Sequence, residues 1–227
     1  DLVQYLSHQD GWFRDMAQRL LVEKNDPKSV GPLEDLAKNG KSELGRFHAL
    51  WTLEGMGKVN APLLLEVLKN GTDLIKTTVL RQLEISVVND PRILHQLEAI
   101  AIDLAAKASE KVSLQLALSS EIFSPEVKID FLSQIINDYG HLALIRDAAM
   151  SSLEGQEYQF LQKIVANKTW TTTSPDWEVF LEMLTTAIIN NRKPAEITGL
   201  LPISDSKEMG WKEAVILSGM AIQAGDL

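Results

Sequence analysis

A basic residue recurs along the first two thirds of this chain at intervals of 30 to 35 residues, and apolar residues follow it at fixed offsets. An apolar residue stands three positions after each basic residue, and a leucine stands seven positions after it. Offsets of three and seven residues lie on one face of an α-helix. The pattern therefore predicts helical units that are too small to bury their own apolar faces and that stack on their neighbours. The five aligned residues are Arg14, Arg46, Lys76, Lys111 and Arg146.

Turn signals fall between the expected helices. Proline after Asp or Ser favours a helix start, because its missing N–H would be unpaired in the first turn anyway, and glycine after Asn favours a helix end. The signals are Asp26-Pro27, Asn39-Gly40, Asn70-Gly71, Asp90-Pro91, Ser124-Pro125 and Tyr139-Gly140. The hairpins that they delimit are 1–8 with 10–24, 28–39 with 42–56, 60–70 with 72–88, 91–106 with 108–123, and 125–138 with 140–154. Helices at 157–166 and 175–191 and a last pair at 194–202 and 206–224 are expected to follow.

We therefore predict an all-α fold, a right-handed α-α superhelix of the HEAT or armadillo type with about seven helical hairpins. We expect a single solenoid domain over residues 1–227, with regular repeats over 1–155 and looser helices over 156–227. Strands are not expected, because apolar and polar residues show no sustained alternation. The Thr-rich segment 169–173 is predicted to be a loop that exposes Trp170.

The composition restricts the classes of function. The chain has no cysteine, which excludes disulfides, thiolate metal sites and cysteine nucleophiles within it. Its net charge of −9 repels phosphate groups, so we expect it to bind neither nucleic acid nor anionic membranes. No apolar run reaches the roughly 18 residues that a membrane span needs, so no membrane insertion is expected.

Both ends of the sequence carry more apolar residues than an exposed helix usually does. The chain starts at Asp1 without a methionine or a leader segment, and we expect it to be a piece of a longer protein. The last helix is apolar around most of its circumference, which predicts a covering on both sides. A continuation of the chain, a partner or a second copy that forms a homodimer through this helix would supply it. Alternatively, this is the core helix of a more globular terminal unit.

No motif for catalysis or cofactor binding is present. None of the four histidines has the spacing of a zinc site, and neither a phosphate-binding loop nor a nucleophile elbow occurs. Asp15 and Asp147 directly follow aligned arginines. These carboxylates form either a ladder of salt bridges between repeats or a line of binding groups. We accordingly predict no catalytic residue, no metal site, no cofactor and no enzymatic activity.

The residues chosen as binding candidates are tryptophans and arginines, because these two types are the usual anchors of protein interfaces. Packing in the core, or salt bridges that set the pitch of the repeats, is the alternative for each of them. The candidates are Trp12, Arg14, Arg46, Trp51 and Arg146.

Four stretches of the chain, 10–24, 47–57, 145–155 and 211–221, resemble the HEAT-repeat region of large exported bacterial proteins. Proteins of this kind occur in Planctomycetes, Verrucomicrobia and Bacteroidetes, and they join a dehydrogenase-like propeller, HEAT repeats and a c-type haem domain. The resemblance implies a periplasmic or cell-surface location and a role as a spacer or docking arm. It transfers no catalytic residue, and the haem-attachment motif is absent because the chain has no cysteine.

We therefore expect a non-catalytic scaffold or spacer whose partner is another protein or a neighbouring domain of the same chain. One alternative is an enzyme on a HEAT frame, such as a pigment lyase or a base-excision glycosylase. The glycosylase would need a basic groove, which the net charge of −9 disfavours. A lyase would need a deep pocket with a few convergent polar groups. A structural spacer without any ligand is the third alternative.

Overall fold

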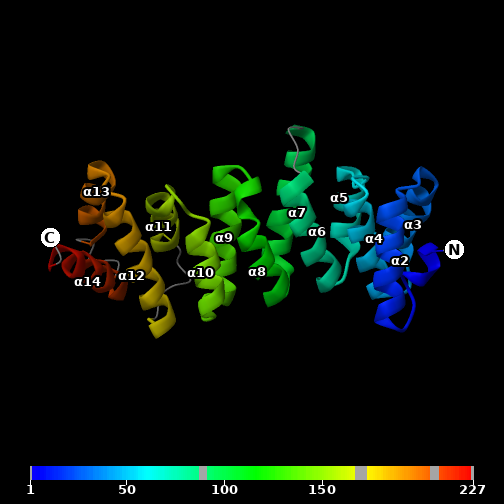
Figure 1. Cartoon of the computed structure of the whole chain (residues 1–227). Coiled ribbons are helices and arrows are strands. Elements are labelled where there is room, and N and C mark those ends of the chain that lie inside the picture. Colours follow the sequence, from blue (N-terminus) through cyan, green and yellow to red (C-terminus); the bar gives the residue numbers. More distant parts are fainter. Residues whose placement is uncertain (1, 87–90, 167–172, 205–209, 226–227) are drawn as a thin grey trace. The chain divides into compact units, whose positions relative to one another are not determined.

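The computed structural model describes residues 2–86, 91–166, 173–204 and 210–225. Fourteen α-helices and two short 3-10 helices make up its regular structure, and these ranges contain no β-strand (Figure 1). The predicted all-α class is confirmed, and the succession of helices joined by short turns is consistent with an α-helical solenoid. Trp170, the predicted exposed aromatic residue, lies outside the described ranges.

Contacts within the chain group its residues into two compact units, Asp1–Leu104 (unit 1) and Ala105–Leu227 (unit 2). The helix α7 (Pro91–Lys107) contains the division between them. The prediction of a single solenoid domain, with looser helices from residue 156 onward, stays a prediction.

Unit 1 is built from two layers of helices. α2, α4 and α6 are neighbours in one layer, α3 and α5 are neighbours in the other, and α3 and α5 each pack on the helix that follows. The short helix α1 packs against α2. The bounds are α1 (Leu2–Tyr5), α2 (Gly11–Lys24), η1 (Pro27–Ser29), α3 (Val30–Asn39), α4 (Glu43–Gly55), α5 (Ala61–Asn70) and α6 (Asp73–Ser86).

Side-chain caps start helices of unit 1 close to the predicted turns. The Asp10 carboxylate accepts a hydrogen bond from the backbone N–H of Trp12 at 2.9 Å, and the Ser42 hydroxyl accepts one from Gly45 at 3.1 Å. Such caps pair N–H groups that the first turn of a helix leaves without partners. Except for α1, which is shorter than predicted, the helices of this unit begin and end within a few residues of the predicted positions.

The aligned apolar positions form the core of unit 1. All six residues that stand three and seven positions after the first three basic residues are buried. The helical face predicted from the repeat is thus confirmed for α2, α4 and α6. The six residues are Ala17, Leu21, Ala49, Leu53, Val79 and Leu83.

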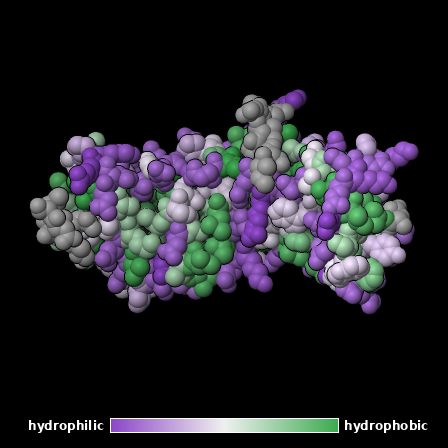
Figure 2. Space-filling model, in the orientation of Figure 1, coloured by the Kyte–Doolittle hydropathy of each residue, from purple (hydrophilic) through white to green (hydrophobic). Residues whose placement is uncertain are grey.

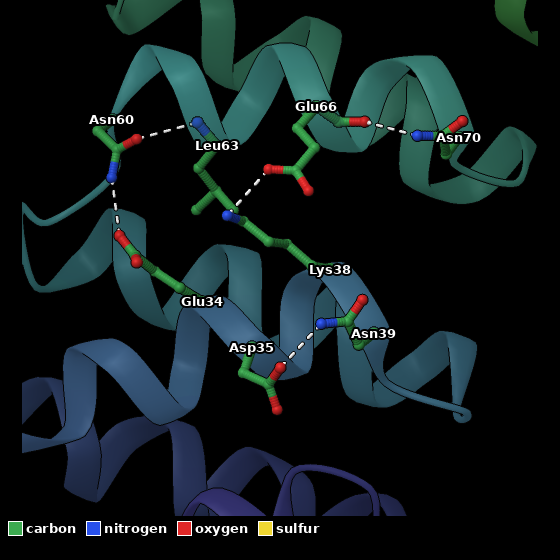
Figure 3. Close-up of polar contacts among 8 residues, drawn as sticks. All are labelled: Glu34, Asp35, Lys38, Asn39, Asn60, Leu63, Glu66 and Asn70. Atoms are coloured by element: carbon green, nitrogen blue, oxygen red, sulfur yellow. Dashed lines mark hydrogen bonds and ion pairs between the residues drawn. The ribbon is translucent and has the colours of Figure 1, made fainter.

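Polar contacts join α3 to α5 in the second layer of unit 1 (Figure 3). Lys38 Nζ lies 2.9 Å from Glu66 Oε2, and Asn60 Nδ2 donates to Glu34 Oε1 at 2.8 Å. Asn60 also caps α5, because its Oδ1 accepts from the backbone N–H of Leu63 at 2.9 Å. Neighbouring hairpins of this unit are therefore joined by paired polar groups, although exposed ion pairs add little stability.

Gly55, at the end of α4, allows a close approach to α2. A Cβ atom at this position would lie 2.9 Å from Val22 Cγ2. Val22 cannot move away cheaply, because a β-branched side chain in a helix has one strongly preferred rotamer.

We therefore expect Gly55→Ala to lower the free energy of unfolding by about 1 kcal/mol through overpacking. Chemical denaturation would measure the loss, and Gly55→Ala in a Val22→Ala background is the matched control. The close approach would be refuted if Gly55→Ala destabilised both backgrounds equally.

Unit 2 continues the alternation of helices. α8 contacts α9 and α10, α9 contacts α11, α10 contacts α12, and α14 packs on α12 and α13. The bounds are α8 (Glu110–Leu118), η2 (Ser120–Ile122), α9 (Pro125–Tyr139), α10 (Ala143–Ser151), α11 (Glu157–Val165), α12 (Pro175–Asn190), α13 (Pro194–Ser204) and α14 (Trp211–Gly225).

The predicted register is wrong in α8. Leu118 is 50% exposed, whereas Leu116 is fully buried, so the core face lies two positions earlier than the alignment on Lys111 implies. Ser152 Oγ of the following repeat donates to Ala117 O at 2.8 Å, so this repeat contacts the same side of α8. Leucine occurs at 114, 116 and 118. The offsets of three and seven from Lys111 therefore reach leucines (114 and 118), although the leucine that is buried is Leu116.

One side of α14 is buried against the rest of unit 2. Ile216 is fully buried, and a Cβ atom on Gly219 would lie 3.1 Å from Thr185. Leu217 is exposed on the same helix. The prediction that a second copy covers this helix stays a prediction. No helix in the described ranges is both long enough and apolar enough to cross a lipid bilayer.

Candidate functional site

The Arg14 side chain forms hydrogen bonds with the backbone of the turn between α1 and α2. Its Nη1 donates to the backbone carbonyls of His8 at 2.7 Å and of Gln9 at 2.9 Å. Its Nε donates to His48 Nε2 on α4 at 3.3 Å. The guanidinium therefore pairs carbonyl groups of the turn and links α2 to the next repeat.

Arg46 and Arg146 act in the same way at the ends of other helices. Arg46 Nε donates to Ala37 O near the end of α3 at 2.9 Å, and Arg146 Nη1 donates to Gly140 O at the end of α9 at 2.7 Å. Arg146 is buried, and its Nη1 also lies 3.1 Å from Asp176 Oδ1. The last carbonyls of a helix have no partner within the helix, and a cation near them interacts favourably with the helix dipole.

The three predicted binding arginines thus share one role, which is to pair backbone carbonyls that precede their own helix: those of a turn for Arg14, and those at the end of the preceding helix for Arg46 and Arg146. Their role in binding a partner stays a prediction. Asp15 and Asp147, which follow two of them, are exposed, and neither makes a hydrogen bond or an ion pair with the described residues. Salt bridges between repeats do occur, but with other carboxylates, such as that of Asp176 for Arg146.

The predicted tryptophans lie on neighbouring helices. Trp12, at the start of α2, is 63% exposed and meets Phe13 in an edge-on contact with 5.1 Å between ring centroids. Trp51 on α4 is half-buried, and its ring centroid lies 6.3 Å from that of Phe47. Figure 2 shows hydrophobic residues (green) among hydrophilic ones (purple) over the α1–α2 end of unit 1.

Apolar side chains form a stripe along the solvent-facing side of α4. Leu44, Phe47 and Trp51 are spaced by three and four residues, which places them on one face of the helix. Leu44 is 44% exposed, and Phe47 and Trp51 are half-buried. We call these three residues the α4 stripe.

A groove of about 460 Å³ lies between α2 and α4, with Trp51 in its lining. Because both helices belong to unit 1, the groove is formed within a single unit. α2 contributes one wall, and the end of α4 contributes the other. The residues that line it are Asp15, Gln18, Arg19, Val22, Glu23, Trp51, Glu54 and Gly55.

Carboxylates predominate around this groove. Asp15, Glu23 and Glu54 face a single guanidinium, that of Arg19, and this group is already bonded to Glu23 at 2.7 Å. Neither Asp15 nor Glu54 has a side-chain hydrogen bond or ion pair with the described residues. The groove therefore combines the aromatic surface of Trp51 with two carboxylates, those of Asp15 and Glu54, that form no ion pair with the described residues.

His48, which is buried on α4, connects the two helices that form this groove. Its Nε2 accepts from Arg14, so its Nδ1 carries the proton and donates to Gln18 Oε1 at 2.7 Å. Burial and the nearby Arg14 guanidinium lower the pKa of His48 below its usual value, and the Asp15 carboxylate opposes this shift. The histidine is thus held neutral, because its proton arrangement matches both partners.

We expect unit 1 to lose stability as the pH falls from about 7 to about 5. The unfolded chain binds a proton to His48 near the ordinary histidine pKa, whereas the folded chain resists it, so stability is fully present above that value and falls below it. Urea denaturation at several pH values would measure this, and His48→Gln should flatten the profile. His95 is exposed, so His95→Gln is the control and should leave the pH dependence of stability unchanged. If His48→Gln also left it unchanged, His48 would not be the residue that causes the loss of stability.

No cluster of three or more histidine, aspartate or glutamate side chains that could hold a metal ion occurs in the described ranges. A second cavity of about 350 Å³ lies where α1 and the end of α2 meet η1 and α3. Its lining contains Lys24, Asp26 and Lys28, but the structure gives these groups no catalytic arrangement.

Leu44, Phe47 and Glu54 belong to the site but are not among the residues predicted from the sequence. The spacing of the α4 stripe was visible in the sequence, since the three apolar residues recur at helical intervals away from the core positions. The unpaired state of Asp15 and Glu54 was not visible, because it depends on which cations the fold brings near.

No protein-family model, no curated protein and no solved structure matched this chain.

Proposed function

We propose that this chain is a HEAT-like module, a right-handed superhelix of about seven hairpins, that acts as a non-catalytic scaffold for protein–protein interaction. The observation that supports the proposal most directly is the groove between α2 and α4. There Trp51 lies beside the carboxylates of Asp15 and Glu54, which have no hydrogen bond or ion pair with the described residues, and Trp12 and the rest of the α4 stripe are accessible on the same two helices. Tryptophan is one of the residue types enriched among the side chains that contribute most to binding at protein interfaces.

The resemblance to exported bacterial proteins supports a proposed location and proposed neighbouring domains for this scaffold. The scaffold lies in the periplasm or at the cell surface, and it connects a dehydrogenase-like propeller to a haem domain. Its partner is then another protein or a neighbouring domain of the same chain. A homodimer through α14 is part of this proposal, since Leu217 is exposed there.

A comparative pull-down tests the proposal. The chain and its Trp51→Ala variant would serve as baits for an envelope extract of the source organism, and the captured proteins would be quantified by mass spectrometry. The matched control is Asp35→Asn, which alters an exposed carboxylate on α3, in the other layer of unit 1. A partner retained by Asp35→Asn and lost by Trp51→Ala is expected. Equal capture by all three baits would contradict a role for the groove.

A further inference from the structure

Two of the three carboxylates that line the α2–α4 groove have no cation partner in the part of the chain that the structure describes. Several carboxylates elsewhere in the described chain do have one: Lys38 lies 2.9 Å from Glu66, and Lys163 Nζ lies 2.7 Å from Asp130 Oδ1. Asp15 and Glu54 have no such partner among the described residues, although they line a groove together. The groove therefore presents uncompensated negative charge at a concave surface.

An aromatic surface adjoins this charge. Trp51 lines the groove, and Phe47 and Leu44 extend the apolar stripe along α4. On α2, Trp12 stands three residues before Asp15 and therefore on the same side of the helix. A cation that lies over an indole face is attracted to it, and a nearby carboxylate strengthens the attraction.

We propose that the α2–α4 groove binds a segment of a partner protein that carries lysine or arginine side chains together with apolar ones. This inference rests on the proposed function and specifies the chemistry of the partner. The apolar side chains of the segment pack on the α4 stripe, as in helix-in-groove recognition. Its cations lie between Trp51 and the carboxylates of Asp15 and Glu54. An acidic segment would be repelled there, and the chain's net charge of −9 favours the approach of a basic one.

Three synthetic peptides of about 15 residues, long enough for a helical face, test the inference. They share one pattern of leucine and alanine and differ only at the polar positions, which are lysine, glutamine or glutamate. Each would be titrated into the full chain while the indole N–H signals are followed by NMR. Trp12 and Trp51 report on the groove, and Trp177 and Trp211 of unit 2 serve as internal references.

The lysine peptide should shift the signals of Trp12 and Trp51 and leave those of Trp177 and Trp211 in place. Raising the salt from about 50 mM to about 500 mM should weaken this binding, because exposed charges are screened. The double variant Asp15→Asn with Glu54→Gln should bind roughly fivefold more weakly, and Trp51→Ala roughly tenfold more weakly. The Asp35→Asn control should bind like the unchanged chain. The double variant keeps the shape of the groove, so it separates loss of charge from loss of folding.

The possible failures are distinct. If the glutamine or glutamate peptide shifted the groove signals as strongly as the lysine peptide, the groove would be an interaction surface without the proposed preference for cations. If the lysine peptide shifted the signals of both units alike, its binding would be a general effect of net charge, and the inference would be wrong. If no peptide moved the Trp51 signal, the groove would not be a docking surface, and the proposed function would fail with it.

Discussion

Leu116→Ala should lower the free energy of unfolding of unit 2 by about 3 kcal/mol, whereas Leu118→Ala should change it by less than about 0.5 kcal/mol. The two substitutions are chemically identical and lie on the same helix. Leu116 is fully buried, so its truncation leaves a cavity, while Leu118 is 50% exposed. Urea denaturation followed by circular dichroism would measure both.

This pair tests the register of the fourth repeat. In the alignment on Lys111, Leu118 is equivalent to Leu53 and Leu83, which are buried in unit 1. In the structure, however, the buried leucine of α8 is Leu116. A large loss for Leu118→Ala together with a small loss for Leu116→Ala would support the sequence alignment and refute the packing of α8 described above.

The second large effect is expected for Arg146→Ala, which should destabilise unit 2 by about 3 kcal/mol. The substitution removes the donor that pairs Gly140 O at the end of α9 and the ion pair with Asp176. It also removes a side chain whose stem is buried. Thermal and urea unfolding of the variant would measure the loss.

Lys111→Ala is the matched control for this prediction. The sequence pattern makes Lys111 equivalent to Arg146, yet Lys111 is exposed, so its removal should change stability by less than about 0.5 kcal/mol. Asp176→Asn should also have a small effect, because its carboxylate is partly exposed. Similar losses for Arg146→Ala and Lys111→Ala would show that the contact with Gly140 O does not stabilise unit 2.

Much of the helical framework could be predicted from the sequence, because local signals set the ends of helices. Asp10, Ser42 and Asn60 cap the helices that follow them with their own side chains. Proline at a helix start and glycine after a helix end act over the same short distance. Such signals depend on a few adjacent residues and need no knowledge of the tertiary fold.

The register of α8 could not be predicted in this way. Its leucines at 114, 116 and 118 alternate, so a helical offset can be fitted to more than one of them. Only the neighbouring helix decides between the fits, here through the hydrogen bond from Ser152 to Ala117 O. Periodicity thus identifies a helix more readily than the face that it buries.

The sequence predicts which residue types belong to the candidate site, but it does not predict what their side chains contact. The spacing in the sequence singles out Arg14, Arg46 and Arg146, but residue identity does not reveal that each of them donates to a backbone carbonyl. Trp12 and Trp51 are predicted interface anchors, and the structure places both where solvent reaches them. Whether these residues bind a partner depends on a second molecule.

Site-specific photo-crosslinking in cells that make this protein tests directly whether the α2–α4 groove is an interaction surface. Benzoylphenylalanine would replace Leu44 on the α4 stripe, or Asp35 on α3 as the control, since both side chains are exposed. We expect a discrete crosslinked product from position 44 that Trp51→Ala abolishes, and none from position 35. The same products from both positions, or none from position 44, would contradict it.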